Sequence, residues 1–215
     1  MISRRDVQEL GEPVRWQQRK SALTRESILS AAVDCLVEQG YAGLTTIEVA
    51  KRAGVSRGAM HHHFANRSEL VSALIDHVLH RRLEFFLGEY IGSLKSAEPL
   101  DAIAQATQLH WQSVLTPEYT AYLELAMASR TDRDLADLLV PATRAFDKEW
   151  AEEMERAFPQ WEARREAMQL ASDLAAAVHL GLLVNRPFMG DPERRAAVRE
   201  RLVQVVETIF RESGR

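Results

Sequence analysis

Hydrophobic side chains recur at three- and four-residue spacing along most of this 215-residue chain. That spacing places them on one face of an α-helix, whereas a half-buried strand would alternate apolar and polar residues. No segment shows sustained alternation, so we predict an all-α fold. The predicted helices cover, in order, residues 24–39, 45–53, 56–64, 68–87, 99–115, 118–130, 132–157 (kinked or broken near Pro141), 162–186 and 192–212.

Local start and stop signals set the ends of the first helices. Thr24 is a candidate N-cap of the helix over 24–39, and Gly40 is expected to end it because glycine adopts positive φ at little cost. In the next helix Thr45 is the N-cap, and Glu48 three residues later completes a capping box. These signals predict that one helix ends and another begins within a few residues.

The stretch from Thr45 to Phe64 has the form of two short helices joined by a tight turn. Gly54 is expected to stop the first helix, and Ser56 is expected to cap the second. This arrangement is the sequence form of a helix-turn-helix, in which the second helix enters the major groove of DNA. Met60 and Phe64 lie four residues apart and should pack inward, so the opposite side of the helix should face DNA.

The charge of the chain permits nucleic-acid binding without indicating a strongly basic protein. The net charge is −4, and the two parts of the chain differ in sign. Residues 1–67 carry ten Lys and Arg against seven Asp and Glu, whereas residues 68–215 carry seventeen against twenty-four. The positive excess lies with the helix-turn-helix, so DNA affinity should rest on a few placed contacts.

The sequence also indicates where the protein works. Its one cysteine, Cys35, excludes an internal disulfide framework and fits a reducing compartment. No apolar run approaches the ~20 residues of a membrane helix, and residues 1–20 lack the apolar core of a secretory signal. We therefore expect a cytoplasmic protein with no membrane partner. Residues 1–20 should form a flexible arm, although Arg15, Arg19 and Lys20 leave open a basic arm that contacts DNA.

The segment from Thr24 to Leu70 resembles the N-terminal DNA-binding domain of the TetR family of transcriptional regulators. The landmarks keep their register over 47 residues. They run from an Ile-Leu-x-Ala-Ala helix through Gly40-Tyr41, Thr45, Val49-Ala50, Arg52-Ala53-Gly54-Val55-Ser56, Arg57-Gly58-Ala59 and His63-Phe64 to Asn66-Arg67 and Leu70. With the resemblance, the chain divides into a flexible arm (1–20), a three-helix DNA-binding domain (21–68) and a helical ligand-binding and dimerisation domain (69–215).

Most candidate DNA contacts lie at the starts of three helices, and His61 and His62 lie on the outward side of the second of them. Hydroxyls and free N–H groups at a helix start suit a phosphate, and Arg57 is the candidate for a bidentate contact to guanine. Where the family often has tyrosine and lysine, this chain has His61 and Arg67, which can still donate to phosphate. The predicted set is Thr45, Thr46, Ser56, Arg57, Gly58, Ala59, His61, His62 and Arg67.

Three consecutive histidines, His61 to His63, invite a metal-binding interpretation. Successive helical side chains point about 100° apart, so these rings cannot converge on one ion as an i, i+4 pair could. We therefore predict no metal site, and the sequence suggests no cofactor.

Two further sets of residues belong to the C-terminal domain. Apolar stripes on the last two helices predict an isologous four-helix bundle between two copies of the chain, although packing within one subunit would also produce them. The predicted dimer residues are Leu174, Val178, Leu182, Leu202, Val205, Val206 and Ile209. Aromatic and methionine side chains of the central helices are either core or the lining of an apolar cavity. The predicted ligand contacts are Trp111, Tyr122, Met127, Phe146, Trp150 and His179.

Together these assignments predict a homodimeric regulator that binds double-stranded DNA at a palindromic operator. The expected function is repression, relieved by a small hydrophobic or aromatic inducer; an activator or a ligand-independent regulator of the same fold stays open. An enzyme is disfavoured, because the sequence has no glycine-rich phosphate loop, no nucleophile motif and no His-Glu zinc pair at helical spacing.

Overall fold

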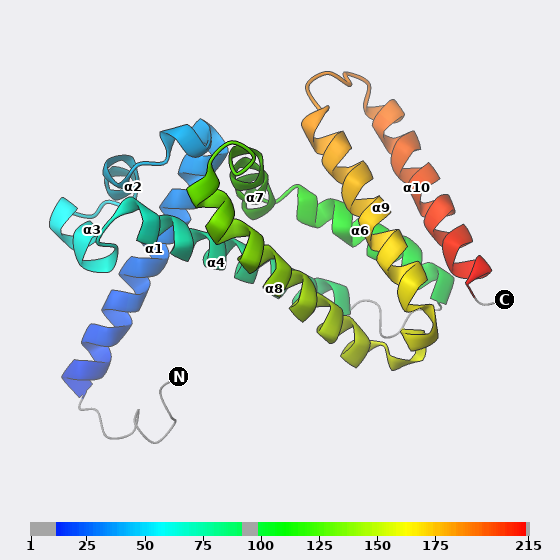
Figure 1. Ribbon diagram of the computed structural model, residues 1–215, viewed down its shortest axis with the longest axis horizontal. Coiled ribbons are helices and arrows are strands. Elements are labelled where there is room, and N and C mark those ends of the chain that lie inside the picture. The colour runs from blue at the N-terminus through cyan, green and yellow to red at the C-terminus, as the bar shows by residue number, and fades with distance from the viewer. Residues whose placement is uncertain (1–11, 92–98, 214–215) are drawn as a thin grey trace. The chain divides into compact units, whose positions relative to one another are not determined.

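The computed structural model describes residues 12–91 and 99–213, and the elements in these ranges are all helical (Figure 1). The all-α prediction is confirmed. The chain divides into two compact units, Met1–His77 and Val78–Arg215. The division falls within a long helix, further along the chain than the predicted boundary at residue 68.

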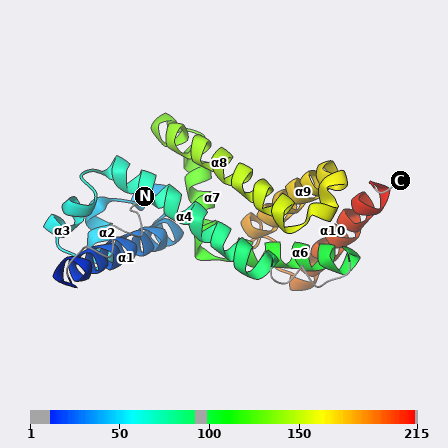
Figure 2. The same ribbon diagram turned by 90° about the horizontal axis from the view of Figure 1, so that it is seen from below.

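The N-terminal unit contains α1, α2, α3 and the first part of α4 (Figure 2). Their bounds are Glu12–Gly43, Thr46–Arg52, Arg57–His63 and Arg67–Phe85. The core between these helices is aliphatic and closed to solvent. Side chains at most 1% exposed are Ile28, Ala32, Cys35, Leu36, Leu44, Val49, Met60, Leu70, Leu74 and Ile75.

Helix α1 begins well before its predicted start. It starts at Glu12, and Pro13 occupies the first turn, where proline is favoured because its missing N–H has no helical partner. Thr24 is therefore not an N-cap: its hydroxyl donates to the carbonyl oxygen of Lys20 at 2.9 Å, inside the helix. The part of the expected flexible arm that covers residues 12–20 is helical, and residues 1–11 lie outside the described ranges.

Two glycines take the positive φ that the sequence predicts. Gly54 has φ 67° in the turn between α2 and α3. Gly40 has φ 67° and ψ −177°, which interrupts the helical path near the end of α1. The amide of Leu44 then donates to the carbonyl of Tyr41 at 3.2 Å and closes the turn that leads into α2. Both predicted breaks are confirmed.

The C-terminal unit contains the end of α4 and the later helices. Their bounds are Phe86–Ile91 (η1), Pro99–Val114 (α6), Pro117–Ala128 (α7), Arg133–Ala157 (α8), Pro159–Arg164 (η2), Arg165–Val184 (α9) and Pro192–Glu212 (α10). These bounds lie within a few residues of the predicted ones. Helix α8 continues through Pro141 without the predicted break, and η1 is a π-helix that the sequence did not indicate.

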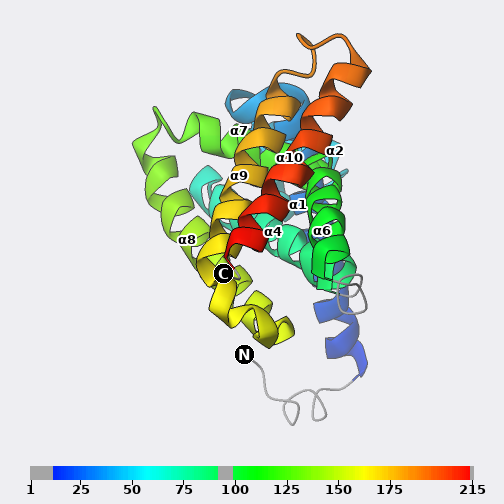
Figure 3. The same cartoon turned by 90° about the vertical axis from the view of Figure 1, so that its right-hand side faces the viewer.

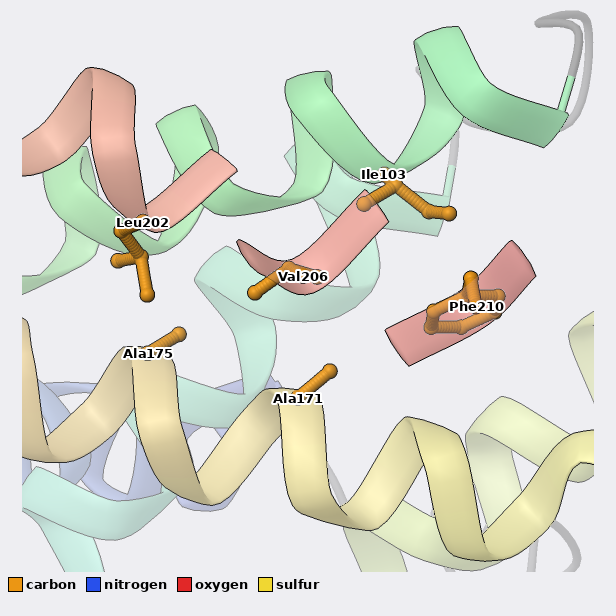
Figure 4. Close-up of a cluster of buried hydrophobic side chains, with 6 residues drawn as sticks. All are labelled: Ile103, Ala171, Ala175, Leu202, Val206 and Phe210. Carbon is orange, nitrogen blue, oxygen red and sulfur yellow. The ribbon is translucent and has the colours of Figure 1, made fainter. Parts of the chain in front are cut away.

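Helices α6, α9 and α10 pack side by side (Figures 1 and 3). Small alanines on α9 allow larger side chains from the neighbouring helices to approach closely. The buried cluster, shown in Figure 4, consists of Ile103, Ala171, Ala175, Leu202, Val206 and Phe210. This cluster fixes the last two helices against the rest of the unit.

One described segment meets a membrane-span criterion, contrary to the expectation that no apolar run is long enough. Glu162–Val184 is long and apolar enough to cross a membrane by length and composition. However, it buries Ala171, Ala175 and His179 against helices of its own unit. A helix packed into a protein core passes the same test, so this segment alone does not indicate a membrane protein.

Candidate nucleic-acid interface and inner cavity

The capping hydroxyls that the sequence predicts shape the helix-turn-helix. Thr45 accepts a hydrogen bond from the amide of Glu48 at 3.2 Å, and Ser56 accepts one from the amide of Ala59 at 3.1 Å. Thr45 and Ser56 are exposed, as a phosphate contact requires, and Thr46 is partly exposed. The caps therefore place hydroxyl and N–H donors at the N-termini of α2 and α3, where anions are favoured.

Helix α3 has one buried and one exposed side. Met60 and the following Phe64 are 1% and 3% exposed, so they anchor the helix to the core. Arg57 and Gly58 are exposed. The predicted division between an inward and an outward side of this helix is confirmed.

The arginines of the N-terminal unit differ in whether they are engaged within the chain. Arg52 forms two 2.7 Å hydrogen bonds with the carboxylate of Glu38, which tie α2 to α1 and lower the pKa of that carboxyl. Arg25 lies over the ring of Phe64. In contrast, no hydrogen bond, ion pair or ring contact within residues 12–91 and 99–213 involves the side chain of Arg57. Its guanidinium is free to contact a partner outside the chain.

Arg67 makes internal contacts that its predicted phosphate role did not include. It donates to the carbonyl of Leu44 at 2.9 Å, to the hydroxyl of Tyr41 at 3.0 Å and to the carbonyl of Tyr41 at 3.3 Å. Its guanidinium also lies 4.4 Å from the centre of the Tyr41 ring. Three of its five N–H donors are thus used to fasten the start of α4 to the turn before α2. Arg67 therefore holds the domain together from within, and its contact with phosphate stays a prediction.

The three consecutive histidines, His61 to His63, lie in different environments. His61 and His62 are exposed, whereas His63 is partly buried. Burial, with His62 and Arg25 as smaller causes, lowers the pKa of His63, so it packs as a neutral ring. No group of residues that could hold a metal ion occurs in the described part of the chain.

His61 has a hydrogen bond that decides how it can meet DNA. Its Nδ1 lies 3.2 Å from the carbonyl oxygen of Ala65. Because a carbonyl only accepts, Nδ1 carries the proton, and Nε2 of the neutral ring is then an acceptor. A phosphate contact through Nε2 therefore requires the doubly protonated imidazolium.

A second feature is a cavity of about 570 Å³ inside the C-terminal unit. It is lined by residues of α4, η1, α6, α7, α8, α9 and α10, and the wide π-helical turn η1 contributes part of its wall. The volume suits a drug-sized molecule. Its apolar walls include Phe86, Phe146, Trp150, Met154 and Met168.

Only two of the six predicted ligand residues reach this cavity. Phe146 and Trp150 line it, while Trp111 and Tyr122 do not. Met127 is 53% exposed, and His179 lines a separate space of about 310 Å³ beside α10. The prediction was limited because a residue's spacing along a helix does not identify the hollow that it faces.

Sequence reasoning also missed Arg82, which lines the cavity. A signal was present: Arg82 lies three residues after Leu79 and four before Phe86, on the apolar stripe of its helix, where a charge is unexpected.

His110, which lines the cavity, and His179 form a buried pair. The Nδ1 atoms of His110 and His179 lie 2.8 Å apart, so the two rings share one proton between them. Burial, then His179 and Arg82, lowers the pKa of His110 to about 3. Burial and then Arg199 lower the pKa of His179 to about 4. Both rings are therefore neutral at physiological pH.

The residues predicted for the dimer interface include both core positions and surface positions. Leu182, Leu202 and Val206 are each 4% exposed within a single subunit, so they are corrected to core positions. Leu174, Val178 and Ile209 are partly exposed. The exposed apolar side chains on and after these helices are Leu170, Val184, Phe188 and Val205.

The N-terminal unit is therefore a helix-turn-helix domain. Residues 28–74 match the family model described as bacterial regulatory proteins, tetR family. An uncharacterised HTH-type transcriptional regulator of Mycobacterium tuberculosis is 31% identical over 125 residues, 58% of this chain and 63% of the relative. The regulator TtgR of Pseudomonas putida is 41% identical over 63 residues, 29% of this chain and 30% of the relative.

Solved structures share the fold over most of the chain. A TetR-family regulator from Rhodococcus sp. superposes with a TM-score of 0.63 at 20% identity, covering 86% of this chain and 97% of that one. One from Mesorhizobium loti gives 0.68 at 16% identity, covering 88% and 96%. Residues 28–74 thus match the DNA-binding domain of the TetR family, the chain spans 63% of the length of the mycobacterial relative, and the relatives that it matches are named as transcriptional regulators.

Proposed function

We propose that the protein is a cytoplasmic homodimeric repressor that binds a palindromic DNA operator through α3 and is released by a small ligand in the C-terminal cavity. The observation that carries the proposal is the free guanidinium of Arg57 at the N-terminus of α3. This helix is anchored by Met60 and Phe64, so its exposed side is held rigidly. A rigid helix with an unpaired arginine at its N-terminus suits bidentate recognition of guanine in the major groove.

Dimerisation supplies the second half of the recognition. One helix reads only a few base pairs, whereas two helices about 34 Å apart read both halves of a palindrome. The exposed apolar side chains Leu170 and Val205, 55% and 39% exposed, support a partner surface on α9 and α10. A second copy that presents the same surface would bury them in an isologous interface.

Helix α4 provides a physical route for ligand control. It starts at Arg67, which is clamped to the helix-turn-helix, and Arg82 near its other end lines the cavity. A ligand that favours one position of the end of α4 would bias the arrangement of the two recognition helices. Such a ligand can weaken DNA binding only by its differential affinity for the two states.

A gel-shift titration with the DNA upstream of the protein's own gene tests the proposal. Arg57→Ala should lower discrimination at one base position per half-site by about 1–3 kcal/mol at fixed salt. The matched control is Arg130→Ala, which removes another exposed arginine, this one in the C-terminal unit. Equal operator affinity and base preference in Arg57→Ala and the wild type would reject α3 as the reading helix.

A further inference from the structure

Arg82 is a charged side chain enclosed by aromatic rings at the wall of the cavity. Its Cζ lies 4.2 Å from the ring centre of Tyr122, and 4.9 Å from those of Tyr119 and Phe146. Tyr119 and Tyr122 come from α7 and Phe146 from α8, so three rings from two helices surround one guanidinium. Cation–π contacts stabilise the positive charge. However, the aromatic faces do not accept hydrogen bonds from the N–H groups, which point outward in the plane of the guanidinium.

Among the described residues, this cation has no counter-ion at contact distance. Within the described residues, no ion pair closer than 4.0 Å involves Arg82; Tyr122, Tyr119 and Asp147 favour its charged form, and Asp147 acts from beyond that distance. Arginine has five N–H donors, and most of those of Arg82 have no acceptor among the residues that the structure describes. Burial lowers the pKa of Arg82, which means that its charged form is desolvated. Desolvation of an unpaired charge is costly, and an anion beside it would offset that cost.

Other charged groups around the cavity do not fill this role. His110 also lines the cavity, but its pKa of about 3 keeps it neutral. Burial raises the pKa of Asp147, with Arg82 opposing, and the residue is largely exposed at the cavity wall. Glu84 is exposed and pairs with Arg81 at 3.0 Å. Glu84 is thus paired with Arg81, and Asp147 acts on Arg82 only from beyond ion-pair distance.

The remaining wall is suited to an apolar or aromatic body. The rings of Phe86 and Trp150 lie 5.4 Å apart, and Met154 is 3% exposed beside them. Methionine and aromatic side chains adapt to flat hydrophobic molecules. The cavity therefore combines an apolar wall with one enclosed cation.

We propose that this cavity binds an aromatic or aliphatic carboxylic acid whose carboxylate pairs with Arg82. The inference rests on the proposed function only in taking the cavity as the ligand site. Arg82 is then the residue that selects anions over neutral or cationic molecules of the same shape. A guanidinium can hold both carboxylate oxygens at once, which adds geometric selectivity to the charge attraction.

Calorimetric titration of the full chain with three matched probes tests the proposal. The probes are 2-naphthoate, the uncharged 2-naphthamide and the cationic 2-naphthylmethylammonium. The wild type should bind naphthoate about 10- to 100-fold more tightly than the amide, as expected for hydrogen bonds to charged groups. Arg82→Met should remove this preference. Arg144→Met is the control, since it deletes an exposed arginine of the same unit that does not line the cavity.

Several results would overturn the proposal. These are equal or tighter binding of the amide or the ammonium by the wild type, no binding of any probe, or an intact carboxylate preference in Arg82→Met. The wild-type comparison stands even where Arg82→Met does not fold. A gel shift of the ligand-free protein is run in parallel: its failure rejects the DNA-binding function, whereas the calorimetric preference tests the ligand class alone.

Discussion

The buried pair of His110 and His179 should make the C-terminal unit sensitive to mild acid. Their pKa values in the folded chain are about 3 and about 4, whereas free histidine has a pKa of about 6.5. Between these values the unfolded chain binds protons that the folded chain excludes. The stability contributed by neutral burial is therefore complete above pH 6.5 and is lost progressively as the pH falls toward 4 and 3.

The magnitude follows from the two sets of pKa values. Between pH 7 and pH 5, protonation of each histidine in the unfolded chain lowers the free energy of unfolding by about 2 kcal/mol. The two histidines together lower it by about 4 kcal/mol. This is a large part of the 5–15 kcal/mol typical of a folded protein, on the order of a third or more. His179 is fully buried and its Nε2 has no hydrogen-bond partner among the described residues, so little there can compensate a second proton.

Urea unfolding at pH 7 and pH 5 measures the effect. Tryptophan fluorescence is a suitable signal, because the ring of Trp111 lies 5.4 Å from that of His179. Protein concentration is kept fixed, since dimerisation would change the apparent stability. His179→Gln cannot take up a proton in this range, so its loss between pH 7 and pH 5 should be smaller by about 2 kcal/mol. The control His80→Gln changes an exposed histidine and should keep the wild-type loss.

An equal loss in His179→Gln and the wild type would refute the argument. That outcome would mean that the pair takes up protons while folded, or that the acid sensitivity arises elsewhere. The initial stability of His179→Gln does not enter this test, because each protein is compared with itself at two pH values.

Two further predictions concern the helix-turn-helix. A Cβ at Gly58 would meet only the Ser56 hydroxyl, at 3.9 Å, so Gly58→Ala should leave the fold intact and stabilise it by up to about 1 kcal/mol. If the backbone of α3 approaches DNA closely there, operator affinity measured by gel shift should nevertheless fall; unchanged affinity would exclude the close approach. Arg67→Lys keeps the charge but loses the fork that holds Leu44 and Tyr41, and should lower thermal stability by about 1–3 kcal/mol. If Arg67→Lys keeps full stability but binds all DNA sequences equally more weakly, Arg67 would instead contact the DNA phosphates.

Local signals in the sequence were sufficient for the helix-turn-helix. The caps at Thr45 and Ser56 and the positive φ at Gly40 and Gly54 each depend on residues within a few positions of one another. Such contacts are encoded by neighbours along the chain, so they can be read without a tertiary model. The inward side of α3 followed in the same way from the four-residue spacing of apolar positions.

Contacts between distant positions were decided only by tertiary structure. The clamp between Arg67 and Tyr41 and the pair of His110 with His179 join residues far apart in sequence. The same holds for Arg82, whose enclosing rings come from α7 and α8. A helical period gives the face of each residue on its own helix, but not which neighbour or hollow that face meets.

The sequence by itself therefore determined the helical class, the helix-turn-helix and its exposed reading side. Tertiary structure decided which arginine is free, which apolar residues of α9 and α10 are core, and which side chains surround the cavity. The physical reason is that capping and periodicity are local, whereas burial and charge pairing depend on the packing of helices that the chain brings together from a distance.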